Sequence, residues 1–128
     1  MGVRRYRDLL AWQLADQLKR GVYALVDNSP AKHDFRFCDQ IKGSASSAPS
    51  NIAEGFGHYH HREFARYIRI AKASIDETHN HLGDGVDRKH WSGKQIEPFL
   101  ELADRAAAAT IRLLQHLLRS EAPRPRRR

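Results

Sequence analysis

The chain has 128 residues, of which 22 are Lys or Arg and 15 are Asp or Glu, so its formal net charge is +7. This length suits one domain with one hydrophobic core, and 41% hydrophobic with 29% charged residues is an ordinary balance for a soluble globular protein. A single cysteine excludes an internal disulfide, and no segment has the roughly 20 apolar residues of a membrane helix. We therefore expect a cytoplasmic protein whose positive charge favours anionic partners, nucleic acid first.

Four segments show the spacing of amphipathic helices, and none shows sustained strand alternation. The first runs from about residue 7 to residue 27, and Asn28-Ser29-Pro30 ends it because proline disfavours helix in the residue before it. The second runs from about residue 34 to residue 56, where Asp34 fits an N-cap. Gly55 and Gly57 suit the left-handed conformation that closes a helix.

The third predicted helix runs from about residue 61 to residue 88, and Gly83 and Gly85 weaken its far end by about 1 kcal/mol each relative to alanine. The fourth follows Ser92 and Gln95, whose spacing fits a capping box. Pro98 suits a helix start better than a helix interior, which favours a separate first turn. A helical domain over residues 1–119 should then be followed by a disordered basic tail, 120–128, that is rich in Arg and Pro.

Short links between four helices favour antiparallel neighbours, so we predict an all-α fold, an antiparallel up-down-up-down four-helix bundle. Pro49 must kink the second helix or break it, because proline lacks an N–H and its ring crowds the carbonyl of Ala45. Asn51 and Glu54 could cap a new helix after a break. The apolar stripe nevertheless passes the proline without losing phase, which favours a kinked, continuous helix.

Polar residues lie beside the apolar stripes of the second and third predicted helices. Asn51 and Glu54 are three residues apart in the second, as are Ser74 and Glu77 in the third. Buried polar groups must find partners or cost about 1–3 kcal/mol each. We expect these four residues to form a structural network that fixes the register of the two helices. A catalytic role for the glutamates lacks a nucleophile or an oriented base, so we predict no enzyme activity and no catalytic residue.

Arginines recur on single faces of the last two predicted helices. One set is Arg62, Arg66 and Arg69, and the other is Arg105, Arg112 and Arg119. Arginine binds phosphate through its planar donor fork, whereas the alternative is a solvated outer face in which Glu101 pairs with Arg105. We predict sequence-nonspecific contact with RNA or DNA through these faces and Lys42. The tail residues that should add salt-sensitive affinity are Arg124, Arg126, Arg127 and Arg128.

The histidines and large aromatic residues have no pattern that demands a ligand. Eight histidines include clusters at 58–61 and 79–81, but a di-metal bundle needs two Glu-x-x-His motifs, and no such pair exists. We therefore predict no metal and no cofactor. Trp12, Tyr23 and Phe56 are interpreted as core or interface packing rather than base-stacking platforms.

Several motifs together resemble a known bacterial family. They are Tyr6-Arg7-Asp8-Leu9 with Trp12-Gln13, Asp39-Gln40-Ile41, Pro49-Ser50-Asn51-Ile52-Ala53-Glu54-Gly55-Phe56-Gly57, Glu63-Phe64-Ala65-Arg66-Tyr67-Ile68, and Ala71-Lys72-Ala73-Ser74 with Glu77. In this order, over about residues 5–118, they resemble the four helix bundle protein family. That family includes proteins encoded by intervening sequences of 23S ribosomal RNA genes and the accessory variability determinant (Avd) of diversity-generating retroelements.

The resemblance implies a four-helix protomer that assembles as a homopentamer with a positively charged surface. In Avd this surface serves nucleic acid and a reverse transcriptase, and the family has no established enzymatic activity. The chain departs from the family pattern at Lys42-Gly43, where a basic pair is usual. The leading hypothesis is a non-enzymatic oligomer that binds nucleic acid. The alternative is a scaffold for an acidic protein partner.

Overall fold

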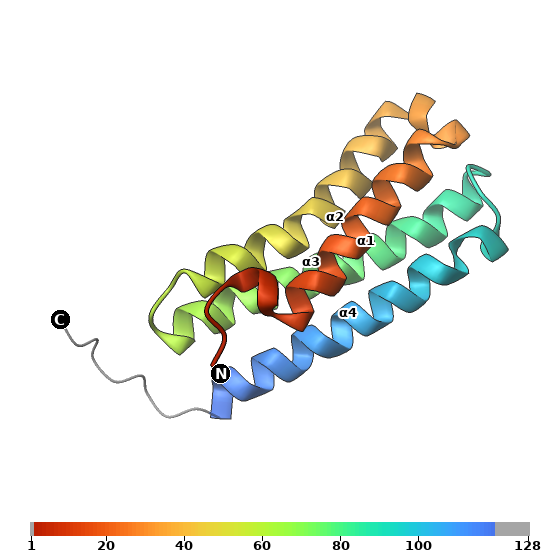
Figure 1. The fold of residues 1–128 in the computed structure, drawn as a ribbon. Helices are drawn as coiled ribbons and strands as arrows, with labels where there is room; N and C mark the ends of the chain where they lie inside the picture. Colours follow the sequence, from red (N-terminus) through yellow and green to blue (C-terminus); the bar gives the residue numbers. More distant parts are fainter. Residues whose placement is uncertain (1, 120–128) are drawn as a thin grey trace.

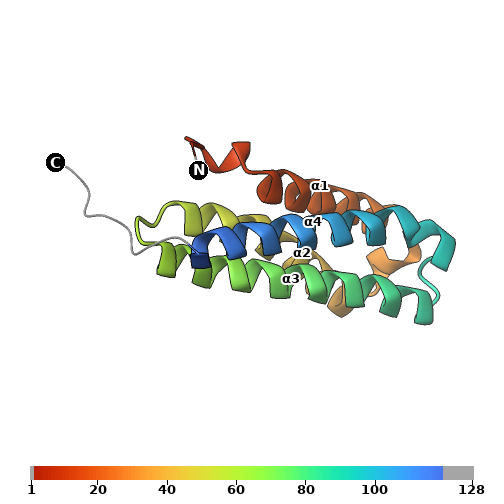
Figure 2. The ribbon, with the colours of Figure 1, turned by 90° about the horizontal axis from the view of Figure 1, so that it is seen from below.

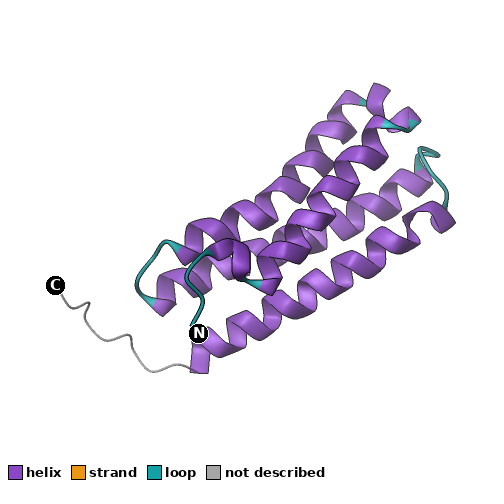
Figure 3. Cartoon of the chain, in the orientation of Figure 1, coloured by secondary structure: helices purple, strands orange, loops and turns teal. Residues whose placement is uncertain are grey.

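A computed structural model describes residues 2–119, and the regular structure in this range is entirely helical (Figure 3). Its elements are two short 3-10 helices, η1 (Tyr6–Asp8) and η2 (Pro30–His33), and four α-helices, α1 (Leu10–Asp27), α2 (Phe35–Phe56), α3 (His61–Asp87) and α4 (Gly93–Arg119). The all-α prediction with four long helices is confirmed. The predicted disorder of residues 120–128 lies outside the described residues.

The helices form a bundle in which each packs against two neighbours. In Figure 1 the chain runs to the upper right along α1 and α3 and returns along α2 and α4. The main packing partners are α1 with α2, α2 with α3, α3 with α4, and α4 with α1. The start of α1, the link between α2 and α3, and the end of α4 lie at one end of the bundle (Figures 1 and 2). We call this the proximal end, and the opposite one, with the other two links, the distal end.

The core follows the predicted apolar stripes along the whole bundle. Its largest fully buried side chains come from α1, α2 and α3, and include Leu18, Val22, Ile41, Ile52, Ile68, Ile75 and Leu82. The α4 contribution consists of Ile96, alanines and leucines, with Thr110 also fully buried. Apolar burial at about 25 cal/mol per Å² is the main force that holds the four helices together.

The first helix begins later than its sequence pattern predicts. The expected helix from residue 7 is divided, because Leu9 has the extended backbone angles φ −73° and ψ 128° and separates η1 from α1. This bend places the Leu9 side chain in the core, where it is 6% exposed. The side-chain amide of Gln13 donates to the carbonyl of Arg7 at 2.9 Å, which holds η1 against the first turn of α1.

Both internal prolines lie within continuous helices. Helix α2 extends through the buried Pro49, as the unbroken apolar stripe predicts, and the Asp34 carboxylate accepts from the Phe37 N–H at its start. Helix α4 likewise extends through Pro98, so the expectation of a separate first turn was wrong. Pro98 and Lys94 are exposed, so water can solvate the Lys94 carbonyl that the proline leaves without an N–H donor.

Glycines have a different role from the one expected of them. Gly57 caps α2 with right-handed angles, φ −72° and ψ −13°, so the predicted left-handed closure was wrong. Gly55 is buried where α2 meets α3, and a Cβ there would lie 2.8 Å from the Cβ of Tyr67 and 2.9 Å from Cδ1 of Phe64. Gly83 and Gly85 do not end α3, which continues to Asp87. Close helix contact, rather than a turn, requires glycine at position 55.

Candidate nucleic-acid interface

Net positive charge is concentrated in the proximal half of the bundle. The midpoints of the helices divide the described charged residues into nine basic and four acidic side chains in this half, and nine basic and ten acidic side chains in the distal half. The proximal set is Arg4, Arg5, Arg7, Arg62, Arg66, Arg69, Lys72, Arg112 and Arg119 against Asp8, Asp16, Glu54 and Glu63. The tail arginines that the sequence analysis named, in residues 120–128, lie outside the described residues.

The α3 arginines lie exposed on the first three turns of that helix. Arg62 and Arg69 have no carboxylate within ion-pair distance among residues 2–119, and Arg66 has a long contact of 3.7 Å to Glu63. The Arg66 guanidinium carbon lies 4.7 Å from the centroid of the Tyr67 ring, which stacks on His58 at 5.1 Å and 18°. The result is an open surface of donors beside a stacked pair of rings.

The α4 arginines divide between the two halves. Arg112 and Arg119 lie in the proximal half, whereas Arg105 lies in the distal half, just beyond the helix midpoint. All three are exposed and have no ion-pair partner in the described part of the chain, so the pairing of Glu101 with Arg105 that the sequence left open does not form here. The structure thus brings five of the six predicted stripe arginines to one end.

Lys42 does not join these arginines. It lies in the distal half of α2, where its ammonium group contacts the Asp27 carboxylate at 2.8 Å and lies 5.5 Å from the Tyr23 ring centroid. The hydrogen bond to Asp27 raises the pKa of Lys42 above its ordinary value. This exposed ion pair offsets part of the Lys42 charge locally, and the phosphate contact predicted for Lys42 stays a prediction.

The polar contact between α2 and α3 uses hydroxyl and amide groups. Ser47 Oγ accepts from the Ser74 hydroxyl at 2.8 Å and from the Asn51 amide at 3.0 Å. One helical turn toward the distal end, the hydroxyls of Ser44 and Thr78 are 2.8 Å apart. The sequence pattern placed Asn51 and Ser74 correctly beside this contact, but did not identify the three hydroxyls that complete it.

The two glutamates lie outside this contact, so that part of the predicted network was wrong. The side chain of Glu54 is 63% exposed and that of Glu77 is 58% exposed. Each faces a histidine four residues later on its own helix, His58 at 3.9 Å and His81 at 3.2 Å. A carboxylate is costly to remove from water, whereas a serine hydroxyl can be satisfied inside by a neighbouring carbonyl.

A groove between α1 and α2 was not predicted. It encloses about 320 Å³, and its lining residues are Tyr6, Arg7, Trp12, Asp16, Lys19, Arg20 and Tyr23 beside Ser46, Pro49, Ser50 and Ala53. The sequence analysis assigned Trp12 and Tyr23 to packing, yet both are only half-buried. The sequence did contain a signal for this groove. Trp12, Asp16, Lys19 and Tyr23 are spaced at i, i+4, i+7 and i+11, so they form a second stripe on α1 next to its apolar stripe.

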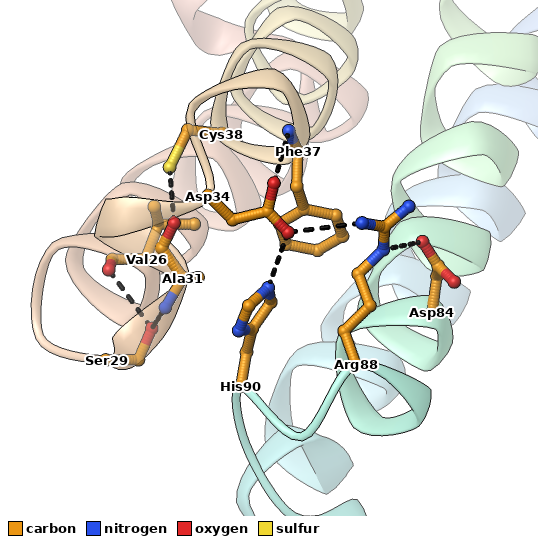
Figure 4. Close-up of polar contacts among 9 residues, drawn as sticks. All are labelled: Val26, Ser29, Ala31, Asp34, Phe37, Cys38, Asp84, Arg88 and His90. Carbon is orange, nitrogen blue, oxygen red and sulfur yellow. Dashed lines mark hydrogen bonds and ion pairs between the residues drawn. The ribbon is translucent and has the colours of Figure 1, made fainter.

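At the distal end, one cluster of four charged or titratable side chains is joined by hydrogen bonds and ion pairs (Figure 4). The Asp34 carboxylate accepts from His90 Nε2 at 2.8 Å and from Arg88 at 3.2 Å, and Arg88 also donates to Asp84 at 2.7 Å. The hydrogen bond from His90 is the main cause that lowers the pKa of Asp34. These contacts join the α3–α4 link to the start of α2.

The single thiol, also in Figure 4, is structural. Cys38 donates from Sγ to the Ala31 carbonyl at 2.8 Å, and burial raises the pKa of this thiol. Within residues 2–119, no three His, Cys, Asp or Glu side chains lie close enough to hold a metal ion together. None of the described helices combines the length and the apolar character that a membrane span requires.

These features define an all-helical bundle with a strongly basic proximal end. Comparison with protein families identifies its relatives: the pattern of the 23S rRNA-intervening sequence protein family matches residues 7–112. The chain belongs to this family, and the family suggested by its sequence motifs is confirmed. A comparison with curated proteins gives no match.

Proposed function

We propose that this protein is a non-enzymatic nucleic-acid-binding protein whose proximal end contacts the phosphate backbone. The observation that carries the proposal is the set of arginines gathered there without carboxylate partners among the described residues, above all Arg62, Arg69, Arg112 and Arg119. An arginine already paired must lose that partner to bind phosphate, whereas an exposed unpaired one needs only to release water and counterions. No base-reading pattern accompanies the arginines, so binding should be nonspecific in sequence.

The test is a mobility-shift and anisotropy titration with RNA and DNA at several salt concentrations. We expect binding that weakens linearly in log K against log salt, with a slope of about −0.7 to −0.9 for each phosphate contacted. The triple variant Arg62→Glu, Arg66→Glu and Arg69→Glu should lose roughly tenfold or more in affinity at about 0.1 M salt.

A matched control separates local charge from net charge. The variant Lys32→Glu, Arg36→Glu and Lys94→Glu changes the net charge by the same amount, but at exposed positions in the distal half. Its affinity should stay within about threefold of the native protein. Equal losses in both variants, or no binding of the native protein at low salt, would reject the proposal.

We extend the proposal to self-association as a homopentamer in the cytoplasm. Support for the assembly comes from the family resemblance and from Leu10 and Leu118, which are 52% and 56% exposed. Support for the cytoplasm comes from the single free cysteine, which fits a reducing compartment. Repetition of the basic end around a ring would strengthen binding through avidity. Light scattering measures the assembly, and a monomer at micromolar concentration would contradict it.

A second candidate function is a scaffold that binds an acidic protein, which the basic proximal end and the same exposed leucines favour. Exposed large apolar side chains are typical of protein interfaces. Given the resemblance to Avd, a reverse transcriptase is the first partner to test. A pull-down with and without nuclease distinguishes the two functions, because a bridged partner is lost after nuclease and a directly bound partner remains.

A further inference from the structure

The α1–α2 groove differs chemically from the arginine faces of the proposed function. The α3 arginines offer charge on a convex helix surface, whereas the groove combines aromatic rings, cations and hydroxyls in a recess of about 320 Å³. This volume lies at the lower end of the range for small-ligand sites. It begins beside η1 at the proximal end and continues along α1 past the midpoint of that helix.

One wall of the groove brings together three flat groups, two aromatic rings and a guanidinium group. The Tyr6 and Trp12 rings meet edge to face at 5.3 Å, and the Arg7 guanidinium carbon lies 5.0 Å from the Trp12 centroid and 5.5 Å from that of Tyr6. Arg7 is exposed and has no ion-pair partner in the described range. A guanidinium plane or an aromatic face of this kind is what an unpaired nucleobase stacks upon.

The opposite wall consists of small residues from α2. Ser46, Pro49, Ser50 and Ala53 follow one another at helical spacing along the groove. Their side chains leave space in front of the rings of α1, and Ser50 is exposed. A flat group the size of a base can therefore approach the Arg7–Trp12 stack from the α2 side.

The cations of the groove are oriented by a buried carboxylate. Asp16 is 7% exposed and contacts the Lys19 ammonium at 3.0 Å and Arg20 Nε at 2.9 Å. Arg20 therefore keeps its terminal N–H groups for another acceptor, and its side chain is 72% exposed. With Arg7 included, the groove carries three cations against one anion, a balance suited to a phosphate next to a stacked base.

Contacts across the end of α2 connect the groove with the α3 arginines. Ala53 lines the groove, and the next residue, Glu54, contacts His58 at 3.9 Å. His58 stacks on Tyr67, which lies under Arg66. A strand that crosses this end of α2 can thus contact phosphate-binding and stacking groups on both sides.

We infer that the α1–α2 groove is a base-stacking subsite, which makes the protein selective for single-stranded over duplex nucleic acid. The inference rests on the proposed function and names its substrate class. In a duplex the faces of the bases are covered by their neighbours, so the Arg7–Trp12 stack finds no base to bind. A single strand offers both an unstacked base and a flexible backbone that can follow the curved surface.

The two tryptophans make this inference directly measurable. Trp12 lines the groove, whereas Trp91 is 5% exposed at the distal end and donates to the Leu82 carbonyl at 2.8 Å. A thymidine oligomer of about 15 nucleotides should quench the Trp12 fluorescence on stacking. The matching duplex and heparin, a polyanion without bases, should quench it little at equal saturation. The Trp91→Phe variant assigns the signal to Trp12.

Substitutions at two positions test the Arg7–Trp12 contact without removing charge from the surface. Arg7→Lys keeps the cation but loses the planar guanidinium group, and should bind the single strand roughly threefold to tenfold more weakly but the duplex by no more than about twofold more weakly. Trp12→Leu should lower single-strand affinity by roughly tenfold, and Trp12→Phe should restore most of it. Circular dichroism at 222 nm checks that each variant remains helical. Phe35→Ala, an exposed aromatic at the distal end, is the control that should change nothing.

The outcomes separate this inference from the function on which it rests. Equal affinity for single strand and duplex, with no selective Trp12 quenching and no effect of Arg7→Lys, would overturn the inference. In that case, binding that still depends on Arg62, Arg66 and Arg69 leaves the proposed function intact. If neither nucleic acid binds at low salt, both fail.

Discussion

A cluster of charged side chains at the distal end and the arginines of the proximal end use charge in opposite ways. At the distal end Asp34, Asp84, Arg88 and His90 are joined to one another, and they hold a link against the start of a helix. The proximal half has more arginines than the distal half, and most of them have no carboxylate partner among the described residues. Charge that is paired within the protein serves its shape. Charge left unpaired is available to a partner, and its removal should cost little stability.

The largest expected effect is on the distal end. Phe37 is 2% exposed and lies between His90 and Trp91, with ring centroids at 5.1 and 5.7 Å. Phe37→Ala should lower the free energy of unfolding by about 3–5 kcal/mol, because it leaves a cavity beneath the Asp34 contacts. Phe35→Ala, two residues earlier and 75% exposed, should change it by less than about 0.5 kcal/mol. Urea unfolding measures both, and similar losses would mean that the distal end is not packed as described.

The next effect concerns the proximal end of the α2–α3 contact. Gly55→Ala should destabilise the protein by about 1–3 kcal/mol, because the new Cβ would lie 2.8 Å from Tyr67 and must push the helices apart. Gly43 lies in the same helix with nothing within 4 Å of an added Cβ. Gly43→Ala should therefore stabilise by about 0.5–1 kcal/mol through helix propensity. Thermal unfolding that moved in the same direction for both would argue against the close approach.

The sequence predicts the four helices well because apolar spacing and burial are the same physical requirement. The unbroken stripe through Pro49 correctly indicates a continuous α2. The pattern fails where one residue's backbone or one close contact decides the outcome, as at Leu9, which divides η1 from α1, and at Gly55. Such features depend on contacts with residues that are distant in the sequence, and the spacing of apolar residues within one segment contains no information about those contacts.

The candidate interface is less predictable than the fold. Spacing correctly places Arg62, Arg66 and Arg69 on one exposed face, because helical period alone fixes this. It does not tell which stripes meet at one end, since that depends on how the helices pack. Nor does it distinguish Lys42, whose partner Asp27 lies on the preceding helix, from an unpaired cation. The groove at Trp12 was missed because the sequence pattern of a half-buried aromatic residue is the same as that of an aromatic residue in the core.

A smaller effect should appear on acidification of the distal end. The pKa of Asp34 is lowered chiefly by the hydrogen bond from His90, which outweighs the opposite effect of burial. A carboxylate whose pKa is lower in the folded chain contributes stability that is complete above the ordinary pKa of aspartate, about 3.9, and is lost as pH falls through the lower value. Asn can still cap a helix, so Asp34→Asn removes mainly the charge.

The expected result is a modest Tm decrease in Asp34→Asn at pH 7 that stays constant to about pH 5 and shrinks below about pH 4. Differential scanning calorimetry of both proteins over this range measures it. A Tm difference that grew on acidification would contradict the sign. Nucleic-acid affinity at pH 7 should be the same for both proteins, because Asp34 lies at the end of the bundle away from the proximal arginines.

The smallest expected effect tests whether pairing, and not charge alone, decides which cations bind. Lys42→Ala and Arg69→Ala each remove one positive charge, but Lys42 contacts Asp27 at 2.8 Å in the distal half, whereas Arg69 has no such partner among residues 2–119. Arg69→Ala should reduce the steepness of log K against log salt by about 0.7–0.9, as expected for one lost phosphate contact. Lys42→Ala should leave that slope unchanged and the affinity within about twofold, since Asp27 already offsets part of its charge, which lies beyond the bound strand. A slope that fell equally in both variants would show that the protein acts through its overall field, and the distinction between the two ends would then have no functional meaning.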